Sequence, residues 1–348
     1  VIAQKKIPLN HTVYDSWKSI TNNSISNDGK WVTYEINPQE GDGNLFLYNI
    51  GNSECDTIPR GYKPALTSNS NMLIFKVKPQ FDTVRAAKLR KVKKDKLPSD
   101  SLGILTISNG EVKKYASLKS ISIPENESDW LAFTLKMQSA EADTTVSDTA
   151  APKKKSKKKE KQKGELLVIM NPITGDSVSF ENVTKYSISK NGNLCAFVRI
   201  MGDTIDSVQV SYFNTNTKQQ AIVKSSSGYS ENIEADKNGT QFVFTYSGDT
   251  IKEKAFELYY YNIPNSYLEL VTGENHSKLN TGWCVSKDGK IYFNDTGSEL
   301  YFGTHPIPVP VQKDTLTEDE KVSVDIWNWK DIQLQPQQLK QLEKEKKR

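Results

Sequence analysis

Histidine and serine are the residues whose chemistry could make this 348-residue chain a hydrolase, and the chain has three histidines. These are His11, His276 and His305. A serine hydrolase of the α/β class carries its nucleophile in a G-x-S-x-G turn between a strand and a helix. That motif does not occur in the chain, and the nearest sequences, around Ser53, Ser177 and Ser298, lack the second glycine. We therefore expect no catalytic residues, and neither His276 nor His305 to act as a general base.

The cysteines Cys55, Cys195 and Cys284 are candidate metal ligands. They are odd in number and far apart, and no C-x-x-C or Cys/His spacing typical of a zinc site accompanies them. Cys195 and Cys284 lie in apolar, strand-like runs, where a free cysteine behaves as a small buried hydrophobe. We expect a structural role for all three, with no metal site and no cofactor. The sequence also singles out no pair of carboxylates for glycosidase chemistry.

Positive charge is concentrated in three short runs. Residues 153–163 carry eight Lys and one Glu, residues 85–96 carry seven basic residues and Asp95, and residues 340–348 carry five basic and two acidic residues. The chain as a whole has a net charge of +4, so the remainder has a net charge of −12. The runs contain no aromatic residue that could stack on bases, which argues against a nucleic-acid partner. We expect solvated loops and a solvated tail, and contact with an anionic membrane or polymer is the alternative.

The overall composition indicates a β-rich protein without a membrane span. Hydrophobic residues make up 36% of the chain, and no apolar run approaches the length of a membrane-spanning helix. Aromatic residues make up 9%, and strand-like stretches recur along the sequence. A chain of this length can bury a large core, so one large domain or two ordinary ones would be self-sufficient.

A repeated pattern organises most of the chain. Each copy has a strand entry, a Ser followed by polar residues and Gly, and then alternating apolar residues, most clearly from Ile25 to Tyr34. Asn-Gly and Asp-Gly supply the positive φ angles of a tight turn, and the alternation is that of a half-buried strand. Second hairpins follow, which gives the four short antiparallel strands of a propeller blade. The other copies lie at residues 66–75, 123–133, 188–197, 234–244 and 285–293.

These repeats predict an all-β fold, a β-propeller of four-stranded antiparallel blades. About six repeats are visible, in a ring that need not be complete. A two-layer sandwich is the alternative, but it does not require a repeating motif. Two wide gaps in the period predict basic insertions at residues 79–100 and 138–164. We expect the first to be partly helical with Asp82 as an N-cap, and the second to contain too little apolar surface to order itself.

The remaining segments complete the predicted domain organisation. Residues 5–331 are assigned to the blades, with residues 325–329 as a further strand, and residues 332–348 to a charged tail that is helical or disordered. Residues 1–4 have the pattern of a bacterial signal-peptide remnant, with Ala3 before the cleavage site and Gln4 starting the mature chain. This predicts a periplasmic, secreted or cell-surface bacterial protein, and an arbitrary boundary is the alternative.

The turn and strand pattern resembles the PD40 (TolB-like) propeller repeat. Taken with the segments 13–17, 78–85 and 324–331, the chain resembles the N-terminal β-propeller region of exported, Bacteroidetes-type, prolyl oligopeptidase-like (family S9) serine peptidases. The resemblance implies that the chain filters and positions oligopeptide substrates for a C-terminal hydrolase domain. The sequence departs from that family's pattern because no G-x-S-x-G is present, so we expect a fragment that is inactive alone.

Two expectations about partners follow from this resemblance. An incomplete ring leaves an open blade edge, at which another protein can pair. The alternative function is a self-standing exported PD40/TolB-like propeller that acts as a protein-interaction module.

Overall fold

The computed structural model describes residues 11–126, 128–137, 164–201, 207–250, 254–273, 276–277, 279–308, 320, 324 and 326–345. The predicted signal-peptide remnant at residues 1–4 lies outside the described residues, as does all but Gly164 of the predicted insertion at residues 138–164. The chain divides into two compact units. Unit 1 comprises residues 1–183 and 190–193, and unit 2 comprises residues 184–189 and 194–348.

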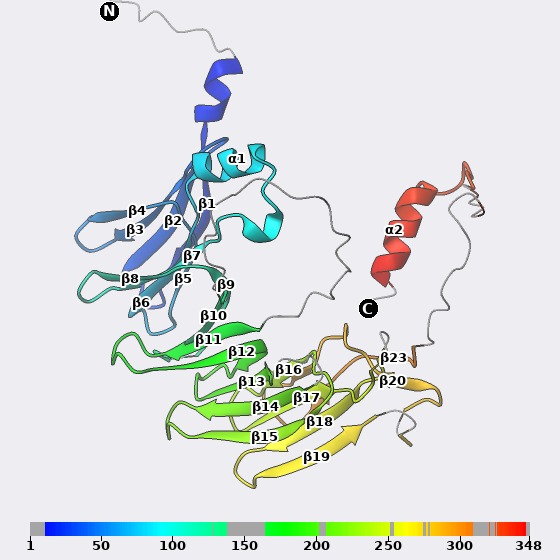
Figure 1. Ribbon diagram of the computed structural model, residues 1–348. Coiled ribbons are helices and arrows are strands. Elements are labelled where there is room, and N and C mark those ends of the chain that lie inside the picture. The colour runs from blue at the N-terminus through cyan, green and yellow to red at the C-terminus, as the bar shows by residue number, and fades with distance from the viewer. Residues whose placement is uncertain are drawn as a thin grey trace, which may run out of the picture. The chain divides into compact units, whose positions relative to one another are not determined.

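Unit 1 consists of three successive antiparallel sheets, each with its strands in sequence order (Figure 1). The first sheet has the order β1-β2-β3-β4 and the second β5-β6-β7-β8, and the third comprises the strands from β9 to the first part of β12 in a seven-stranded sheet that runs from β9 to β15. The strands are β1 (Lys18–Ile25), β2 (Trp31–Pro38), β3 (Asn44–Asn49), β4 (Cys55–Pro59), β5 (Gly61–Leu66), β6 (Met72–Val77), β7 (Ser101–Thr106), β8 (Glu111–Tyr115), β9 (Leu118–Ser122), β10 (Leu131–Leu135), β11 (Glu165–Met170) and β12 (Ser177–Ile188).

Unit 2 repeats the same arrangement. The last residues of β12 and the strands β13, β14 and β15 are the unit 2 part of the seven-stranded sheet, and β16 to β19 form the next, four-stranded sheet. Two further pairs follow, β20 with β23 and β21 with β22. The strands are β13 (Leu194–Ile200), β14 (Ser207–Asn214), β15 (Gln220–Ser227), β16 (Ile233–Ala235), β17 (Gln241–Tyr246), β18 (Glu257–Asn262), β19 (Tyr267–Thr272), β20 (Trp283–Val285), β21 (Tyr292–Phe293), β22 (Leu300–Tyr301) and β23 (Thr304–Pro306).

The fold class predicted from the repeats is confirmed, because the protein is built from four-stranded antiparallel sheets of propeller type. In the first five repeats the turn joins two consecutive strands that pair with each other, whereas the sixth lies between β20 and β21, which pair with β23 and β22. In four of these turns a side-chain oxygen of the first turn residue accepts a hydrogen bond from the backbone N–H five residues later. The pairs are Ser26 with Trp31 (2.9 Å), Thr67 with Met72 (3.1 Å), Ser189 with Leu194 (3.0 Å) and Asp236 with Gln241 (3.2 Å). In these four repeats the sequence therefore encodes a capped turn between two paired strands.

The middle strands of the second sheet, β6 and β7, are buried on both faces because this sheet packs between its two neighbours. In β6, Leu73 and Phe75 join a cluster with residues of the first sheet, whereas Met72 and Ile74 join one with residues of the third. Alternate residues of a strand point to opposite faces, so the near-continuous apolar run of β6 serves two cores. The first-sheet partners include Leu45 and Leu47, and the third-sheet partners include Leu118, Leu131 and Phe133.

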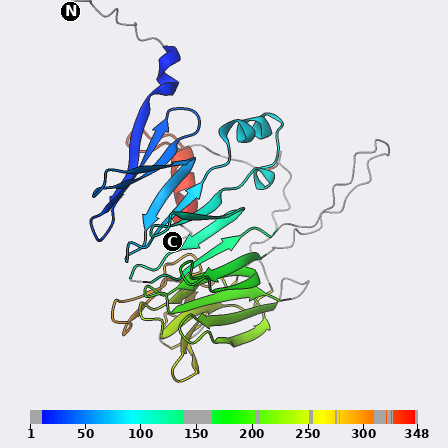
Figure 2. The same ribbon diagram turned by 90° about the vertical axis from the view of Figure 1, so that its left-hand side faces the viewer.

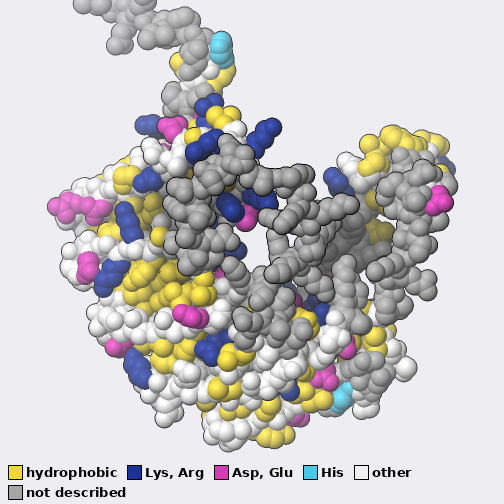
Figure 3. All heavy atoms as spheres, viewed as in Figure 1, with side chains coloured by type: hydrophobic (Ala, Val, Ile, Leu, Met, Phe, Trp, Pro, Cys, Tyr) yellow, Lys and Arg dark blue, Asp and Glu magenta, His cyan; other side chains and the backbone are white. Residues whose placement is uncertain are grey.

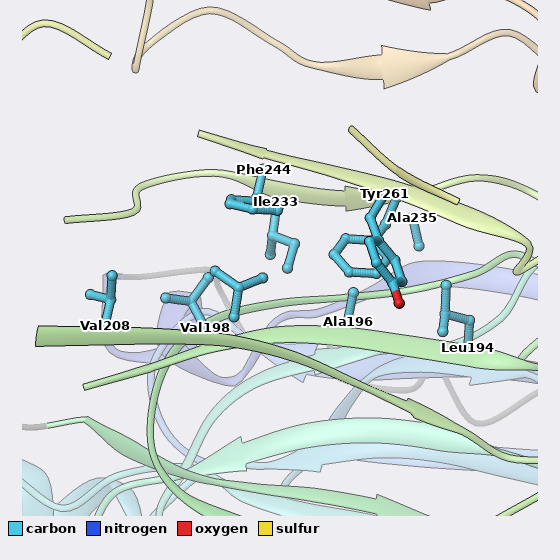
Figure 4. Close-up of a cluster of buried hydrophobic side chains, with 10 residues drawn as sticks. Leu194, Ala196, Val198, Val208, Ile233, Ala235, Phe244 and Tyr261 are labelled. Carbon is cyan, nitrogen blue, oxygen red and sulfur yellow. The ribbon is translucent and has the colours of Figure 1, made fainter. Parts of the chain in front are cut away.

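Unit 2 contains an equivalent core between two adjacent sheets. Figure 4 shows Leu194, Ala196, Val198 and Val208 facing Ile233, Ala235, Phe244 and Tyr261. These side chains are 0–8% exposed. The small Ala196 lies opposite the aromatic rings, which allows the two sheets to interdigitate at close-packed density.

The basic insertion between β6 and β7 forms a helix, α1 (Phe81–Leu89), followed by the short 3-10 helix η2 (Lys94–Lys96). Figures 1 and 2 show α1 outside the sheets of unit 1. The prediction of Asp82 as N-cap is wrong. The N-cap position is Gln80, Asp82 lies in the first turn, and the Phe81 N–H donates to Asp42 Oδ1 at 3.0 Å. The capping carboxylate thus comes from the loop between β2 and β3, where sequence spacing alone cannot identify it.

The segment around the two C-terminal tryptophans differs from the prediction of a strand. Residues 326–330 form no strand, and Trp327 and Trp329 are 70% and 89% exposed. The helix α2 (Gln335–Glu345) follows within the charged tail, and a 3-10 helix, η1 (His11–Ser16), precedes β1. Among the described helices, none has the length and apolar content needed to cross a membrane.

Candidate functional site

The first strands of the three sheets in unit 1, β1, β5 and β9, all depart from regular pairing with the next strand. Each contains a β-bulge, at which extra residues face the second strand of the sheet. The bulged residues are Asn22 and Asn23 in β1, Lys63 and Pro64 in β5, and Lys119 in β9. Asn22 and Lys63 have φ angles of 49° and 48°, a left-handed conformation that is uncommon for residues other than glycine. Bulges re-aim side chains and are over-represented next to functional sites.

The carboxylate of Glu35 fixes the first two bulges to each other. Glu35 lies on β2 and is 3% exposed. Its Oε1 accepts hydrogen bonds from Asn22 Nδ2 at 2.7 Å and from the Lys63 backbone N–H at 2.6 Å. Its Oε2 accepts one from Asn37 Nδ2 at 3.0 Å. A buried carboxylate is tolerated only when its oxygens are satisfied in this way, so Glu35 positions the bulges of β1 and β5.

A second polar bridge joins β5 to β9. The Tyr62 hydroxyl donates a short hydrogen bond to Asp100 Oδ2, and the Asp100 carbonyl accepts the backbone N–H of Leu118 at 2.8 Å. Burial and the adjacent Asp100 carboxylate raise the pKa of Tyr62, so this hydroxyl stays protonated and remains a donor. Lys78 Nζ lies 5.0 Å from the centroid of the Tyr62 ring. The three bulged strands are therefore connected by side chains and do not depend on packing alone.

We call the exposed residues Asn22, Asn23, Lys63 and Lys119 the bulge surface. Figure 1 shows β1, β5 and β9 along one side of unit 1, with β4 and β8 on the opposite side. Lys119 lies 3.6 Å from Glu165 Oε1, whereas Lys63 makes no ion pair with a described residue. The surface thus offers side-chain amides and an unneutralised ammonium group. Such groups are suited to binding a polar or anionic extended chain.

The residues considered for catalysis from sequence do not converge on this surface. His11 is exposed in η1, His276 lies in a turn after β19, and His305 lies on β23. Ser53 and Ser298 lie in turns, and Ser177 begins β12. None of these serines joins a strand to one of the described helices, as a nucleophile elbow requires.

The cysteines lie in three different environments. The predicted burial of Cys195 and Cys284 is confirmed, since both are 0% exposed, and burial raises the pKa of the Cys195 thiol. Cys55 is exposed on β4, with the Tyr34 hydroxyl 3.7 Å from its sulfur. Among the described residues, no three His, Cys, Asp or Glu side chains form a group that could hold a metal ion.

The structure does bring one cysteine next to a histidine, which the sequence analysis missed. Cys284 and His305 are cross-strand partners on β20 and β23, with Cys284 Sγ 3.7 Å from His305 Nε2. The signal for this pairing is weak because the two residues are 21 positions apart. Full burial of Cys284 keeps its sulfur from any substrate, so the pair has the features of a packed core contact and not those of a nucleophile with its base.

A small polar pocket in unit 2 has a volume of about 110 Å³. It is lined by Ser247, Gly248, Asp249, Ala255, Phe256 and Glu257. Both carboxylates already have partners: Asp249 Oδ2 accepts the Ala255 N–H at 2.9 Å, and Glu257 Oε2 accepts the Tyr259 hydroxyl at 3.0 Å. The pocket is too small for a peptide, so the bulge surface is the stronger candidate for a binding site.

Sequence analysis did not identify the bulge surface. Asn22-Asn23 and Lys63-Pro64 are compatible with a break in strand pairing, because Asn tolerates positive φ and Pro cannot donate to a ladder. These local signals do not reveal that Glu35 links the two positions. That link spans 28 residues and becomes visible only once the two sheets are placed side by side.

The chain matches no protein-family model, and no curated protein matches it. Among solved structures, it is similar to an oligogalacturonate lyase in complex with manganese, with 13% identity, a TM-score of 0.41, and coverage of 82% of this chain and 76% of that one. It is also similar to acylaminoacyl peptidase from Pyrococcus horikoshii, with 10% identity, a TM-score of 0.40, and coverage of 83% and 43%. The β-propeller domain of the Trilobed protease from Pyrococcus furiosus shows 11% identity, a TM-score of 0.39, and coverage of 82% and 78%.

The chain thus spans less than half the length of the acylaminoacyl peptidase that it resembles. The TM-scores lie below 0.5. The assignment of the fold therefore rests on the chain's own sheets and capped turns.

Proposed function

We propose that this chain is the non-catalytic propeller portion of an exported serine peptidase of prolyl oligopeptidase type. In this proposal the propeller filters oligopeptides and positions them for a hydrolase domain that is not among these residues. Its origin in the Bacteroidetes, its PD40 repeats and its location in the periplasm or at the cell surface belong to the same proposal. The sequence resemblance at residues 13–17, 78–85 and 324–331 supports it.

The observation that carries the proposal is the bulge surface. Three first strands of unit 1 bulge, and polar bridges through Glu35 and Asp100 join them. The exposed residues there are hydrogen-bonding and cationic, with no serine or cysteine among them. This combination supports a surface that binds the backbone amides and the C-terminal carboxylate of an extended peptide without cleaving the peptide.

The test measures binding and cleavage separately. A fluorescein-labelled, proline-containing oligopeptide with a free C-terminal carboxylate is titrated with the protein, and its fluorescence anisotropy is recorded. We expect saturable binding that Lys63→Glu weakens about tenfold or more, because the substitution replaces an attractive charge with a repulsive one. Lys114→Glu on the outer strand β8 makes the same charge change away from the surface and should leave the affinity within about twofold.

Cleavage is followed with a chromogenic prolyl peptide, which the chain alone should not turn over. Turnover that is abolished by replacing one of its own serines would contradict the non-catalytic role. Binding that Lys63→Glu and Lys114→Glu weaken equally would show that net charge, and not the bulge surface, holds the peptide.

One observation favours the alternative, a self-standing propeller that acts as a protein-interaction module. The face of the first sheet that points away from the second sheet carries apolar residues, and two of them on β1, Ile20 and Ile25, are 67% and 61% exposed. Tyr34 and Phe46 stack on the same face with their ring centroids 5.1 Å apart. Such a face is suited to a protein partner at an open blade edge. The coding sequence beyond residue 348 separates the two functions: a continuing frame with G-x-S-x-G supports the peptidase, and a stop codon supports the module.

A further inference from the structure

The charge along α1 and the turn that follows it is strongly asymmetric. Acidic groups lie at the beginning of the helix, where Asp82 occupies the first turn and Asp42 accepts the Phe81 N–H. Basic residues occupy its last turns and continue through η2. They are Arg85, Lys88, Arg90, Lys91, Lys93, Lys94 and Lys96, and all seven are exposed. Figure 3 shows Lys and Arg side chains gathered on the visible face at α1.

None of these seven cations forms an ion pair with a described acidic residue. Elsewhere in the described chain, lysines do find acidic partners, as Lys190 does with Glu125 at 2.9 Å. Seven neighbouring cations with Asp95 as the acidic residue among them repel one another, and a nearby anionic surface relieves that repulsion. The segment is therefore electrostatically complementary to an extended array of negative charge and not to a single anion.

Leu89 adds an apolar component to this surface. It is 71% exposed and stands between Lys88 and Arg90 in the sequence. Ala87, two positions earlier, is the buried residue of the helix. Positions two apart on a helix point in nearly opposite directions, so Leu89 faces away from the protein. A large apolar side chain among cations is unfavourable in water but favourable at a membrane interface.

We propose that α1 and the turn after it, residues 85–96, form a docking surface for a membrane rich in anionic phospholipid. The cations lie at the level of the phosphate groups, and Leu89 enters the boundary with the acyl chains. A group of four to eight Lys and Arg on or beside a helix is typical of anionic-lipid binding. The absence of aromatic residues in residues 85–96 disfavours nucleic acid.

Co-sedimentation of the full chain with vesicles tests this proposal. Vesicles of phosphatidylglycerol mixed with phosphatidylcholine should bind the protein, and vesicles of phosphatidylcholine alone should not. Replacement of four cations together, Arg85→Gln, Lys88→Gln, Arg90→Gln and Lys91→Gln, should lower the partition coefficient by roughly a hundredfold or more, because each basic residue contributes about fivefold. Leu89→Ser should lower it about fivefold through loss of apolar burial.

A charge-matched control replaces four exposed lysines elsewhere: Lys114→Gln, Lys290→Gln, Lys330→Gln and Lys340→Gln. Its partition coefficient should remain within about threefold of that of the unchanged protein. Circular dichroism of each variant establishes that it is folded. Equal losses in the two quadruple variants would overturn the proposal, since net charge alone would then explain binding. Tighter binding to a DNA duplex than to vesicles would point instead to nucleic acid and would also overturn the proposal.

Discussion

The Lys63 backbone N–H donates a 2.6 Å hydrogen bond to Glu35 Oε1, and this contact joins the bulged first strand of one sheet to the second strand of the sheet before it. Asn22 donates to the same oxygen at 2.7 Å. One buried carboxylate thus determines where two exposed bulges lie. The positions of the residues in the bulge surface therefore depend on hydrogen bonds to the buried Glu35 carboxylate.

Glu35→Gln should lower the free energy of unfolding by about 2 kcal/mol. The Glu35 carboxylate accepts hydrogen bonds at both oxygens, and in Gln one of these oxygens becomes an NH2 group that faces a hydrogen-bond donor. Chemical denaturation measures the change. Glu40→Gln, at an exposed position in the following loop, is the matched control and should change stability by less than about 0.5 kcal/mol. Equal effects of the two substitutions would show that Glu35 does not hold the bulges.

Gly103 and Phe75 should be energetically coupled. They are directly opposed on β7 and β6, and a Cβ added at Gly103 would overlap the Phe75 ring, which is 1% exposed. Gly103→Ala should therefore destabilise the protein by about 1–3 kcal/mol through overpacking. In a Phe75→Leu background the same substitution should cost at least about 1 kcal/mol less. A double-mutant cycle measures this coupling, and strictly additive effects would contradict it.

The capped turns should contribute to stability individually. Ser26 is 3% exposed, and its Oγ accepts the Trp31 N–H at 2.9 Å. Ser26→Ala should lower the free energy of unfolding by about 1 kcal/mol, whereas Ser225→Ala, at an exposed position on β15, should have little effect.

The Ser26 hydroxyl also donates to Asp28 Oδ1 and is the main cause of the lowered pKa of the Asp28 carboxyl. NMR titration of the Ser26→Ala protein should show the Asp28 pKa moving up towards its ordinary value; an unchanged pKa would rule out this bond.

Stability at alkaline pH should depend on Tyr259. Burial, followed by the hydrogen bond from its hydroxyl to Glu257, raises the pKa of Tyr259 to about 12. In the unfolded chain the Tyr259 hydroxyl ionises near pH 10. The contribution of Tyr259 to the free energy of unfolding is therefore complete below pH 10 and is lost as the pH rises towards 12. The wild-type protein should lose more stability across this interval than Tyr259→Phe does. An equal loss of unfolding free energy in the two proteins between pH 10 and pH 12 would contradict the raised pKa of Tyr259.

The blades were predictable because their signals are local. Asn191-Gly192 and Asp288-Gly289 predict turns. The alternation of apolar residues after them predicts strands, which the structure contains as β13 and β21. The true N-cap contact of α1 was not predictable, since Asp42 lies 39 residues before Phe81. The strand expected at residues 325–329 is absent from the described part of that segment, because strand propensity around Trp327 and Trp329 is not sufficient without a partner strand.

The candidate site shows the same limit more strongly. Its exposed members are ordinary polar residues, and no motif connects Asn22, Lys63 and Lys119 in the sequence. Their relationship comes from the packing of successive sheets and from buried Glu35. Sequence reasoning could exclude a nucleophile elbow, because that motif is contiguous, but it could not locate a surface assembled from three strands.

Hydrogen exchange measured by mass spectrometry, with and without a saturating proline-containing oligopeptide, tests the central claim most directly. If the chain binds peptides at the bulge surface, protection should increase in segments covering residues 18–25, 61–66 and 118–122, and the recovered peptide should be uncleaved. Protection confined to the outer strands β4 and β8, or cleavage of the peptide by the chain alone, would contradict the account.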